Sequence, residues 1–220
     1  MVNPPKALTV GAFGARGTGK TAWIVQYLEK LKPKRLLIWD YKDDPPIEHL
    51  GRAVYTLPEL ARLAQAPTFR LRYVVDHSGP DIHEQFERFC MVAWFAGNLD
   101  MYVAELPEVT KANKAPPTWR RCVNVGRSYR LGGMPKSLGI LADGQRMAEI
   151  DKSFISNLDI VHSGRLNDLA DAKRMANTLG VKYSDILALP DLHYIEKRAD
   201  TPQATRGILK FSKKIAAPRR

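Results

Sequence analysis

The segment at residues 14–21, GARGTGKT, constrains the fold of this chain more than any other part of the sequence. It matches the spacing G-x-x-x-x-G-K-S/T, with Gly14, Gly19, Lys20 and Thr21 at the defined positions. The apolar run ALTVGAF precedes the segment, and TAWIVQYLEKL follows it with apolar residues on one helical face. A strand, a glycine-rich loop and a helix in this order predict a phosphate site, because backbone N–H groups of the loop can turn inward.

Each part of the loop has an expected role in binding ATP and Mg²⁺. We expect the Lys20 ammonium to reach the β- and γ-phosphates and the Thr21 hydroxyl to hold Mg²⁺. Backbone N–H groups of the remaining residues would surround the phosphates. The expected ATP-binding residues are Gly14, Ala15, Arg16, Gly17, Thr18, Gly19, Lys20 and Thr21.

Apolar runs alternate with amphipathic stretches along the 220 residues, which predicts an α/β fold with a mostly parallel central sheet flanked by helices. The expected strands are residues 7–13, 35–40, 69–76, 100–106, 137–142 and 158–163. The expected helices are residues 20–31, 57–65, 82–96, 117–130, 147–156 and 167–179. We expect one P-loop ATPase domain over residues 1–190, followed at 191–220 by a β-hairpin, HYIEKRA with GILKFS, and a basic tail.

The net charge of +11 falls largely at the C-terminal end of the chain, where the last twenty residues hold six Lys or Arg and no acid. Such a tail attracts polyanions through counterion release, with nucleic acid the commonest partner; a solvated terminus is the alternative. The longest apolar run, FCMVAWFAG at residues 89–97, is too short to cross a bilayer, and the first residues lack a signal-peptide pattern. We therefore expect a cytoplasmic protein without a membrane span.

Polar residues follow several of the expected strands, at the points where those strands end. Asp40 and Lys42 follow RLLIW, Gln145 and Arg146 follow SLGILADG, and Arg165 follows DIVHSG. Ligands of an open parallel sheet lie at the carboxyl ends of its strands. We therefore expect these polar groups to converge around the nucleotide.

The order of these features resembles the FtsK/HerA superfamily of DNA-pumping ATPases, and in particular the small genome-packaging ATPases of viruses. The shared features are GARGTGKT, the strand end WDYKD, the segment from AELPEV to GRSYRLGG, and the strand end ILADGQR. The likeness extends over about residues 7–180. It implies a P-loop NTPase of the RecA/FtsK-like type that hydrolyses ATP.

The resemblance also implies roles for residues beyond the loop. Gln145 corresponds to the polar sensor that contacts the γ-phosphate or the attacking water. An arginine before that strand reaches into the neighbouring subunit; Arg127 and Arg130 occupy this region, with Arg146 and Arg165 as the remaining alternatives. A guanidinium donated by a neighbour neutralises charge on the transferred phosphoryl group and makes hydrolysis depend on assembly.

The second metal-binding motif departs from the family pattern, which is an apolar strand ending in Asp-Glu. The sequence here is MYVAEL, so Ala104 stands where the Asp is expected and Glu105 is the remaining acid. We interpret Glu105 as the catalytic base, with the Mg²⁺ partner beside Thr21 as its alternative role. Glu108, and Asp76 at the end of RLRYVVD, are rival carboxylates.

The expected function is a motor subunit that hydrolyses ATP in a homo-oligomeric ring, a pentamer or hexamer, and moves double-stranded DNA through phosphate contacts. The basic residues expected to face the duplex backbone are Lys111, Lys114, Arg120 and Arg121, and a solvated loop is the alternative for them. A capsid vertex or portal protein is a further expected partner. The expected locations are the host cytoplasm and the virion.

Other classes of function stay open at this point. A P-loop kinase acting on a small molecule or nucleotide needs an arginine-rich lid, and nothing in the sequence marks one. A virion-assembly or secretion ATPase, like the toxin-like proteins of filamentous phages, shares the nucleotide core but usually continues into a membrane span. A non-enzymatic nucleotide switch is a further alternative, because Ala104 replaces the expected Asp.

Overall fold

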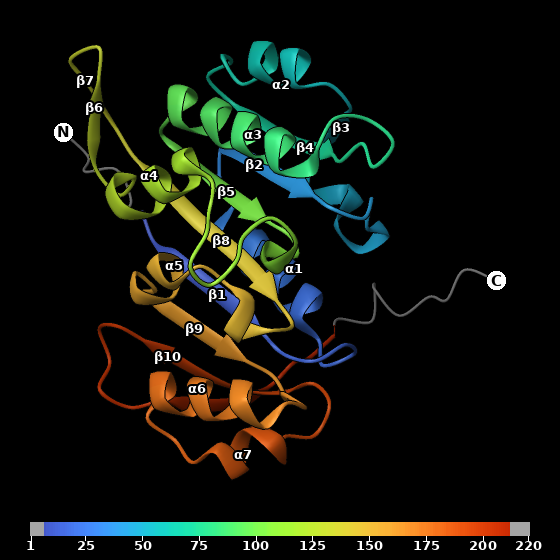
Figure 1. The fold of residues 1–220 in the computed structure, drawn as a ribbon, viewed down its shortest axis with the longest axis vertical. Coiled ribbons are helices and arrows are strands. Elements are labelled where there is room, and N and C mark those ends of the chain that lie inside the picture. The colour runs from blue at the N-terminus through green and yellow to red at the C-terminus, as the bar shows by residue number, and fades with distance from the viewer. Residues whose placement is uncertain (1–6, 212–220) are drawn as a thin grey trace.

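The computed structural model describes residues 7–211, and nine of its strands form one sheet (Figure 1). These strands are β1 (Thr9–Phe13), β2 (Arg35–Asp40), β3 (Arg52–Val54), β4 (Phe69–Val74), β5 (Leu99–Val103), β8 (Leu138–Gly144), β9 (Ile160–Ser163), β10 (His193–Arg198) and β11 (Thr205–Ile208). Their order across the sheet is β11-β10-β9-β1-β8-β5-β2-β4-β3. The strands from β3 to β9 in this order are parallel, and β10 and β11 are antiparallel at one edge. The predicted α/β fold with a mostly parallel sheet is confirmed.

The two faces of the sheet are covered unequally. Helix α1 (Lys20–Leu31) and the 3-10 turn η1 (Pro45–Leu50) pack on one face. The opposite face is covered by α2 (Leu57–Leu63), α3 (Ile82–Ala96), α4 (Pro117–Val125), α5 (Lys152–Ser156), α6 (Leu169–Leu179) and α7 (Tyr183–Leu187), with the turns η2 (Leu106–Glu108) and η3 (Met147–Glu149). Within the part of the chain that the structure describes, no helix combines the length and apolarity that a bilayer crossing needs.

Strand β2 shows why both faces of the sheet are apolar. Its sequence RLLIWD carries apolar residues in succession, and side chains of a strand alternate between the faces. Ile38 belongs to the core on the α1 side. Trp39 belongs to the opposite core, where its ring lies 5.0 Å from Phe86 and 5.4 Å from Phe89 of α3, measured between centroids. Because β2 is buried on both faces, its sequence is a continuous apolar run instead of an alternation of apolar and polar residues.

Three predicted elements, at residues 20–31, 35–40 and 82–96, have the predicted bounds. The helix predicted over residues 147–156 is interrupted, because it consists of η3 and then α5. The Asp151 carboxylate accepts hydrogen bonds from the first N–H groups of α5 and so fixes where that helix begins. The prediction also omitted β3, η1 and α7, which are short.

The helix predicted over residues 117–130 is wrong over its last five residues, 126–130. Helix α4 ends at Val125, and β6 (Tyr129–Leu131) and β7 (Met134–Lys136) form a separate hairpin after it. Gly132 and Gly133 make the turn of this hairpin with φ of 55° and 79°, values that glycine adopts at little cost. Arg130 therefore lies on a hairpin that projects beyond the sheet (Figure 1) and not on a helix.

The predicted C-terminal hairpin is present and continues the main sheet. Strand β10 pairs antiparallel with β9, and β11 pairs with β10. The second hairpin strand covers Thr205–Ile208, which begins before the predicted GILKFS. The basic end at residues 212–220 lies outside the described residues. Since β10 extends the sheet of the predicted ATPase domain, residues 191–211 pack as part of that unit.

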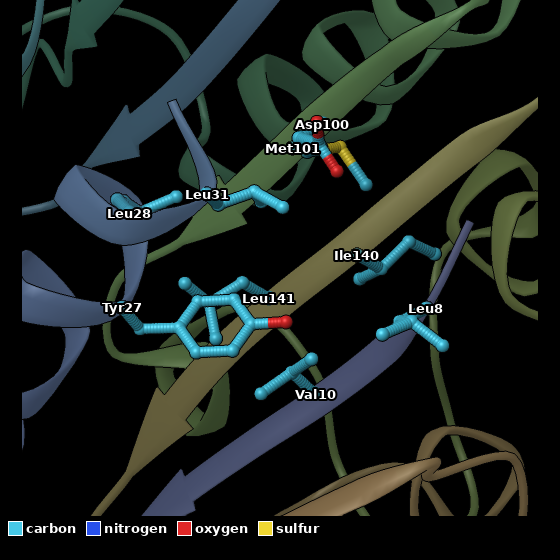
Figure 2. A pocket seen from close by; sticks show the side chains of 9 residues that line it. All are labelled: Leu8, Val10, Tyr27, Leu28, Leu31, Asp100, Met101, Ile140 and Leu141. Atoms are coloured by element: carbon cyan, nitrogen blue, oxygen red, sulfur yellow. The ribbon is translucent and has the colours of Figure 1, made fainter. Parts of the chain in front are cut away.

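A small cavity lies between α1 and strands β1, β5 and β8, at the amino ends of the strands (Figure 2). Its volume is about 30 Å³, enough for one water molecule. The lining residues are Leu8, Val10, Tyr27, Leu28, Leu31, Asp100, Met101, Ile140 and Leu141. Asp100 is the charged member of this apolar lining, and burial raises the pKa of its carboxyl to about 6.

We predict that Asp100→Asn stabilises the protein at neutral pH. The folded-state pKa of about 6 exceeds the ordinary value of 3.8, so the parent loses stability as the pH rises from about 4 to 6. At pH 7.5 the variant should have a free energy of unfolding higher by about 2–3 kcal/mol, at 1.36 kcal/mol for each pKa unit. Urea unfolding at several pH values measures this difference. A difference that stays constant between pH 4 and 7.5 would contradict the explanation.

Candidate nucleotide-binding site

The glycine-rich loop joins the carboxyl end of β1 to the first turn of α1. Strand β1 lies between β8 and β9, so the loop sits at the centre of the carboxyl edge of the sheet. Gly14, Gly17 and Gly19 all have positive φ values, which curl the backbone. Gly19 precedes α1 and supplies no side-chain cap, so the first N–H groups of the helix are not satisfied by a capping side chain. This arrangement suits an anion, because these N–H groups and the helix dipole both favour negative charge.

Neighbouring segments hold the loop in this conformation. The Ala15 N–H donates to the Arg165 carbonyl at 2.7 Å, and the Thr18 hydroxyl donates to the Ala15 carbonyl at 2.8 Å. Leu209, just after β11, packs against the loop so closely that a Cβ atom at Gly19 would lie 2.5 Å from its Cδ1. The φ of 97° at position 19 favours glycine, and a side chain there would also displace the Leu209 side chain.

Lys20 lies with its ammonium group inside the loop. Its side-chain nitrogen Nζ donates to the carbonyl oxygens of Gly14 at 2.7 Å and Ala15 at 3.0 Å, and the residue is only 9% exposed. Burial lowers the pKa of Lys20, while the nearby carboxylates of Asp143 and Glu105 act in the opposite direction. Both acceptors are neutral carbonyls, and no carboxylate of residues 7–211 is in direct contact with this positive charge at the centre of the loop.

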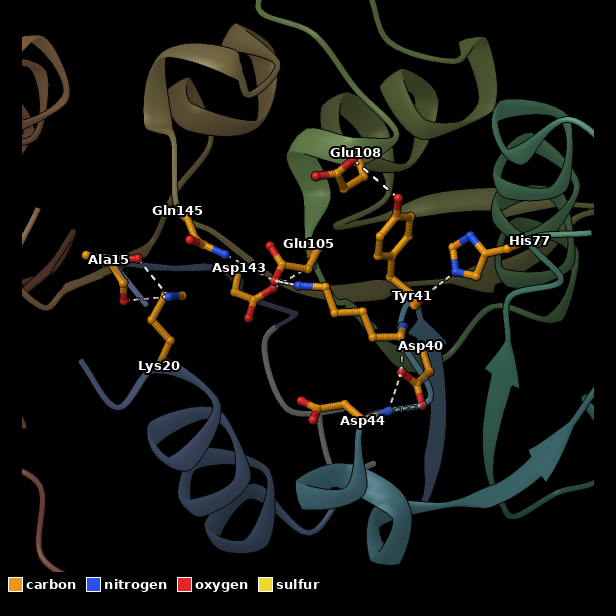
Figure 3. A network of polar contacts seen from close by, with 12 residues as sticks. Ala15, Lys20, Asp40, Tyr41, Asp44, His77, Glu105, Glu108, Asp143 and Gln145 are labelled. Carbon is orange, nitrogen blue, oxygen red and sulfur yellow. Dashed lines mark hydrogen bonds and ion pairs between the residues drawn. The ribbon is translucent and has the colours of Figure 1, made fainter. Parts of the chain in front are cut away.

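Three of the residues expected at the strand ends come together near Lys20 (Figure 3). Glu105 follows β5, and its Oε1 pairs with the Lys42 Nζ at 2.5 Å. The Gln145 amide group also donates to Glu105 Oε1, at 3.4 Å. Glu105 has a φ of 53°, in the left-handed region, which directs its side chain away from the line of β5. The catalytic base and the sensor predicted from the sequence are therefore neighbours.

Asp143, at the end of β8, belongs to this cluster and was missed as a functional residue. Its Oδ1 accepts a hydrogen bond from the Glu105 backbone N–H at 2.7 Å, and Tyr102 approaches its Oδ2 at 3.4 Å. Burial, together with the charge of Glu105, raises the pKa of Asp143 to about 7. An apolar strand ending in Asp was the signal that drew attention to Asp40 and Asp76, and ILADG carries the same signal.

Asp40 does not converge on the loop, which corrects the expectation for this residue. Its carboxylate is fully buried and pairs with Arg72 of β4. It also accepts hydrogen bonds from the backbone N–H groups of Lys42 at 3.3 Å and Asp44 at 3.1 Å. Asp40 therefore fixes the segment that carries Lys42, while Lys42 itself reaches Glu105.

The other predicted acids lie away from the loop. Glu108 is exposed, and its Oε2 accepts a hydrogen bond from the Tyr41 hydroxyl at 3.3 Å. Asp76 follows β4, which is separated from β1 by three strands, and its Oδ1 is bonded to Ser78. Among residues 7–211 there is no group of three His, Cys, Asp or Glu side chains that could hold a metal ion alone. A divalent ion at this site would therefore need ligands from a nucleotide as well.

The four candidate arginines form contacts within the chain. Arg146 pairs with Asp171 at 2.9 Å, and Arg165 pairs with Asp191 at 2.8 Å.

Arg127 and Arg130 are placed differently. The Arg127 guanidinium pairs with Asp159 at 2.5 Å near the amino end of β1, at the edge of the sheet opposite the loop. Arg130 is exposed on the β6–β7 hairpin, where its guanidinium donates to the Gly133 carbonyl at 2.9 Å.

The four basic residues expected to meet DNA, Lys111, Lys114, Arg120 and Arg121, are exposed. The backbones of Lys111 and Lys114 bond to each other in a tight turn. Both lysines line an open hollow of about 580 Å³ beside the start of α4. The Arg121 guanidinium lies 5.5 Å from the centre of the Trp94 ring. All four side chains are therefore open to contact with a polyanion.

Comparison with known proteins finds a similar fold in viral and conjugative NTPases. No protein-family model matches the chain. Protein P9 of Pseudoalteromonas phage PM2 is 26% identical over 183 residues, which covers 81% of this chain and 78% of P9. The genome packaging NTPase B204 of Sulfolobus turreted icosahedral virus 2, solved in complex with ATP-gammaS, has a TM-score of 0.67 at 14% identity, covering 93% of this chain and 98% of B204.

The chain has the fold of a genome-packaging NTPase. A bacterial conjugative coupling protein, TrwBdeltaN70, has the same core with a TM-score of 0.65 at 11% identity, covering 96% of this chain and 86% of TrwBdeltaN70. The RecA/FtsK-like P-loop fold and the resemblance to packaging ATPases predicted from the sequence are thus confirmed. In this packaging-NTPase fold the loop at residues 14–21 occupies the centre of the carboxyl edge.

We predict that Asp40 acts on stability through Arg72. Replacing Arg72 by Met leaves a buried carboxylate without its cation, and this should lower the free energy of unfolding by about 3–5 kcal/mol. Adding Asp40→Asn to Arg72→Met should recover part of that loss, because the uncompensated charge is removed. Urea unfolding of the parent, both single variants and the double variant gives the coupling energy. Additive effects in this cycle would contradict the assignment.

Proposed function

We propose that this chain is an ATP-hydrolysing, DNA-translocating motor subunit of a viral genome-packaging machine. The observation that carries the proposal is the meeting of Lys20, Glu105 and Gln145 at the carboxyl edge of a packaging-NTPase fold. The similarity to a phage protein and to a packaging NTPase over most of the chain supports the viral setting. We place its action in the host cytoplasm at a capsid vertex or portal, with the virion as a further location.

The loop and its surroundings fit a nucleoside triphosphate. Its N–H groups and the start of α1 would bind the phosphates, and Lys20 would exchange its loop carbonyls for phosphate oxygens. Mg²⁺ bound with the nucleotide neutralises negative charge on the phosphates, and Thr21 with a nearby carboxylate would hold it. Glu105 takes the proton of the attacking water, while Gln145 orients that water.

The pairing of Lys42 with Glu105 affects how this base works. The Lys42 ammonium contacts Oε1 of Glu105, so it occupies one of the two oxygens that could accept the proton of the attacking water. The same pair also holds the Glu105 side chain at the end of β5. Hydrolysis therefore requires the carboxylate to exchange at least part of its contact with Lys42 for the attacking water.

Assembly into a pentameric or hexameric ring would bring an arginine of one subunit to the nucleotide of the next. Arg130 suits this role because the β6–β7 hairpin projects beyond the sheet (Figure 1). Arg127 would first have to leave Asp159, with which it pairs at 2.5 Å. We therefore favour Arg130 as the arginine that acts on the neighbouring site.

Contacts with double-stranded DNA are proposed for Lys111, Lys114, Arg120 and Arg121. These side chains are exposed, and lysine or arginine contacts to phosphate do not distinguish base sequence. Binding should therefore tolerate any sequence and weaken steeply as the salt concentration rises, because bound counterions are released. Duplex DNA should stimulate the release of phosphate from ATP.

The decisive experiment separates nucleotide binding from hydrolysis. We predict that Lys20→Ala loses ATP binding, because the cation at the centre of the loop is removed. We predict that Glu105→Gln binds ATP but loses turnover by at least about a hundredfold, the usual contribution of a general base. Equilibrium binding of a fluorescent ATP analogue and phosphate release with and without duplex DNA give the two readouts. A phosphorylated acceptor in place of free phosphate would indicate a kinase instead.

Mixed assemblies test which arginine acts on the neighbouring subunit. We predict that Arg130→Ala and Glu105→Gln are each inactive alone, whereas a mixture of the two regains phosphate release. In the mixture, an intact Arg130 from a Glu105→Gln subunit can serve an intact Glu105 in an Arg130→Ala subunit. Arg62→Ala, at an exposed arginine of α2, is the matched control and should keep full activity. Recovery with Arg127→Ala but not with Arg130→Ala would reassign the role.

A further inference from the structure

Asp143 occupies a position between the loop strand and the strand that carries Glu105. In the parallel register of β8 with β1, Asp143 lies opposite Ala12, two residues before the loop begins. In the register of β8 with β5, Ala142 lies opposite Val103, so Asp143 comes next to Ala104. The neighbouring residue Leu141 belongs to the core on the α1 side of the sheet. Asp143 is two residues further along, so alternation places its side chain on that same face, where the loop leads into α1.

The Asp143 carboxylate is buried without a cation beside it. The residue is 5% exposed, and within residues 7–211 no lysine, arginine or histidine nitrogen forms an ion pair with it. Its contacts are the Glu105 N–H and the Tyr102 hydroxyl, and both are neutral donors. A buried carboxylate is costly unless a positive charge compensates it. Lys20 and Lys42 both interact with it electrostatically, but Lys20 is bonded to carbonyls of the loop and Lys42 is paired with Glu105.

Ala104 and Asp143 are complementary in size and charge. The small side chain of Ala104 is buried on the α1 side, next to Asp143 across the strand pair. A second carboxylate at position 104 would lie beside the one at 143, and two buried like charges repel each other. Position 104, just after β5, therefore carries no acid, whereas Asp143 on the neighbouring strand β8 supplies one beside it.

We propose that Asp143 supplies, from β8, the carboxylate that together with Thr21 holds the Mg²⁺ ion of a bound nucleotide. This inference rests on the proposed function, since the ion arrives with ATP. It assigns the metal to Asp143, so Glu105 keeps the single role of base. It also explains why a carboxylate is buried without a cation next to a phosphate-binding loop: the divalent ion compensates its charge.

A purely structural role is the competing explanation. The Asp143 carboxylate holds the Glu105 backbone, and this contact alone could justify its presence. The variant Asp143→Asn separates the two roles, because the amide oxygen still accepts the Glu105 N–H while the negative charge is lost. The matched control is Glu108→Gln, which removes an exposed carboxylate in the turn after β5, where it is bonded to Tyr41 and not to the loop segment.

The experiment measures ATP affinity with Mg²⁺ and with EDTA for the parent, Asp143→Asn and Glu108→Gln. We expect Mg²⁺ to tighten binding by the parent and by Glu108→Gln equally. In Asp143→Asn the tightening should fall by about 10–100-fold, while affinity in EDTA stays the same or improves. Electron paramagnetic resonance with Mn²⁺ and ATP reports the metal directly, and the apparent Mn²⁺ affinity should fall in the same variant only.

A relocated carboxylate completes the test. Adding Ala104→Asp to Asp143→Asn restores one acid beside the loop, on β5 instead of β8, and should recover most of the Mg²⁺-dependent tightening. An Asp143→Asn protein with the tightening of the parent would overturn the proposal and leave Asp143 with a positioning role. Failure of the parent to bind ATP at all would overturn the proposed function, and this inference with it. Loss of tightening in Glu108→Gln alone would assign the metal to Glu108.

Discussion

The parallel register of β1, β8 and β5 is the constraint on which the candidate site depends. It fixes the loop, Asp143 and Glu105 at the ends of three adjacent strands, so their spacing follows from backbone hydrogen bonds. The buried contact from the Glu105 N–H to Asp143 then sets the left-handed conformation of Glu105. A change in the pairing of β8 would displace the sensor, the base and Asp143 together.

The sequence predicted the parts of the fold that local patterns control. The loop, α1 and α3 follow from glycine spacing and from helical periodicity, and their bounds agree with the structure. The helix predicted over 117–130 is too long, because α4 ends at Val125 and Tyr129 and Arg130 belong to the β6–β7 hairpin, whose Gly-Gly turn follows them. The short strand β3 has too few residues to show a period, and its place depends on pairing with β4.

The sequence predicted the site residues that belong to a local motif. It did not predict those whose role depends on a contact with another strand. Glu105 and Gln145 were identified from their strand ends, and they lie together. Asp40 was misplaced because its partner Arg72 is distant in sequence and only the sheet brings them into contact. Asp143 does not follow from the family pattern, because that pattern places the metal carboxylate on the segment around β5, whereas the acid beside Ala104 is on the adjacent strand.

The contact between Leu209 and Gly19 has a consequence for the limits of the folded unit. Leu209, near the end of the described residues, is buried against the phosphate loop near the start of the chain. A carbonyl of the same terminal segment, that of Lys210, accepts a hydrogen bond from Gln26 of α1. Shortening the polypeptide before Leu209 would uncover the phosphate loop and the start of α1. Leu209 and Lys210 therefore belong to the folded unit, and a minimal fragment that keeps the loop covered has to include them.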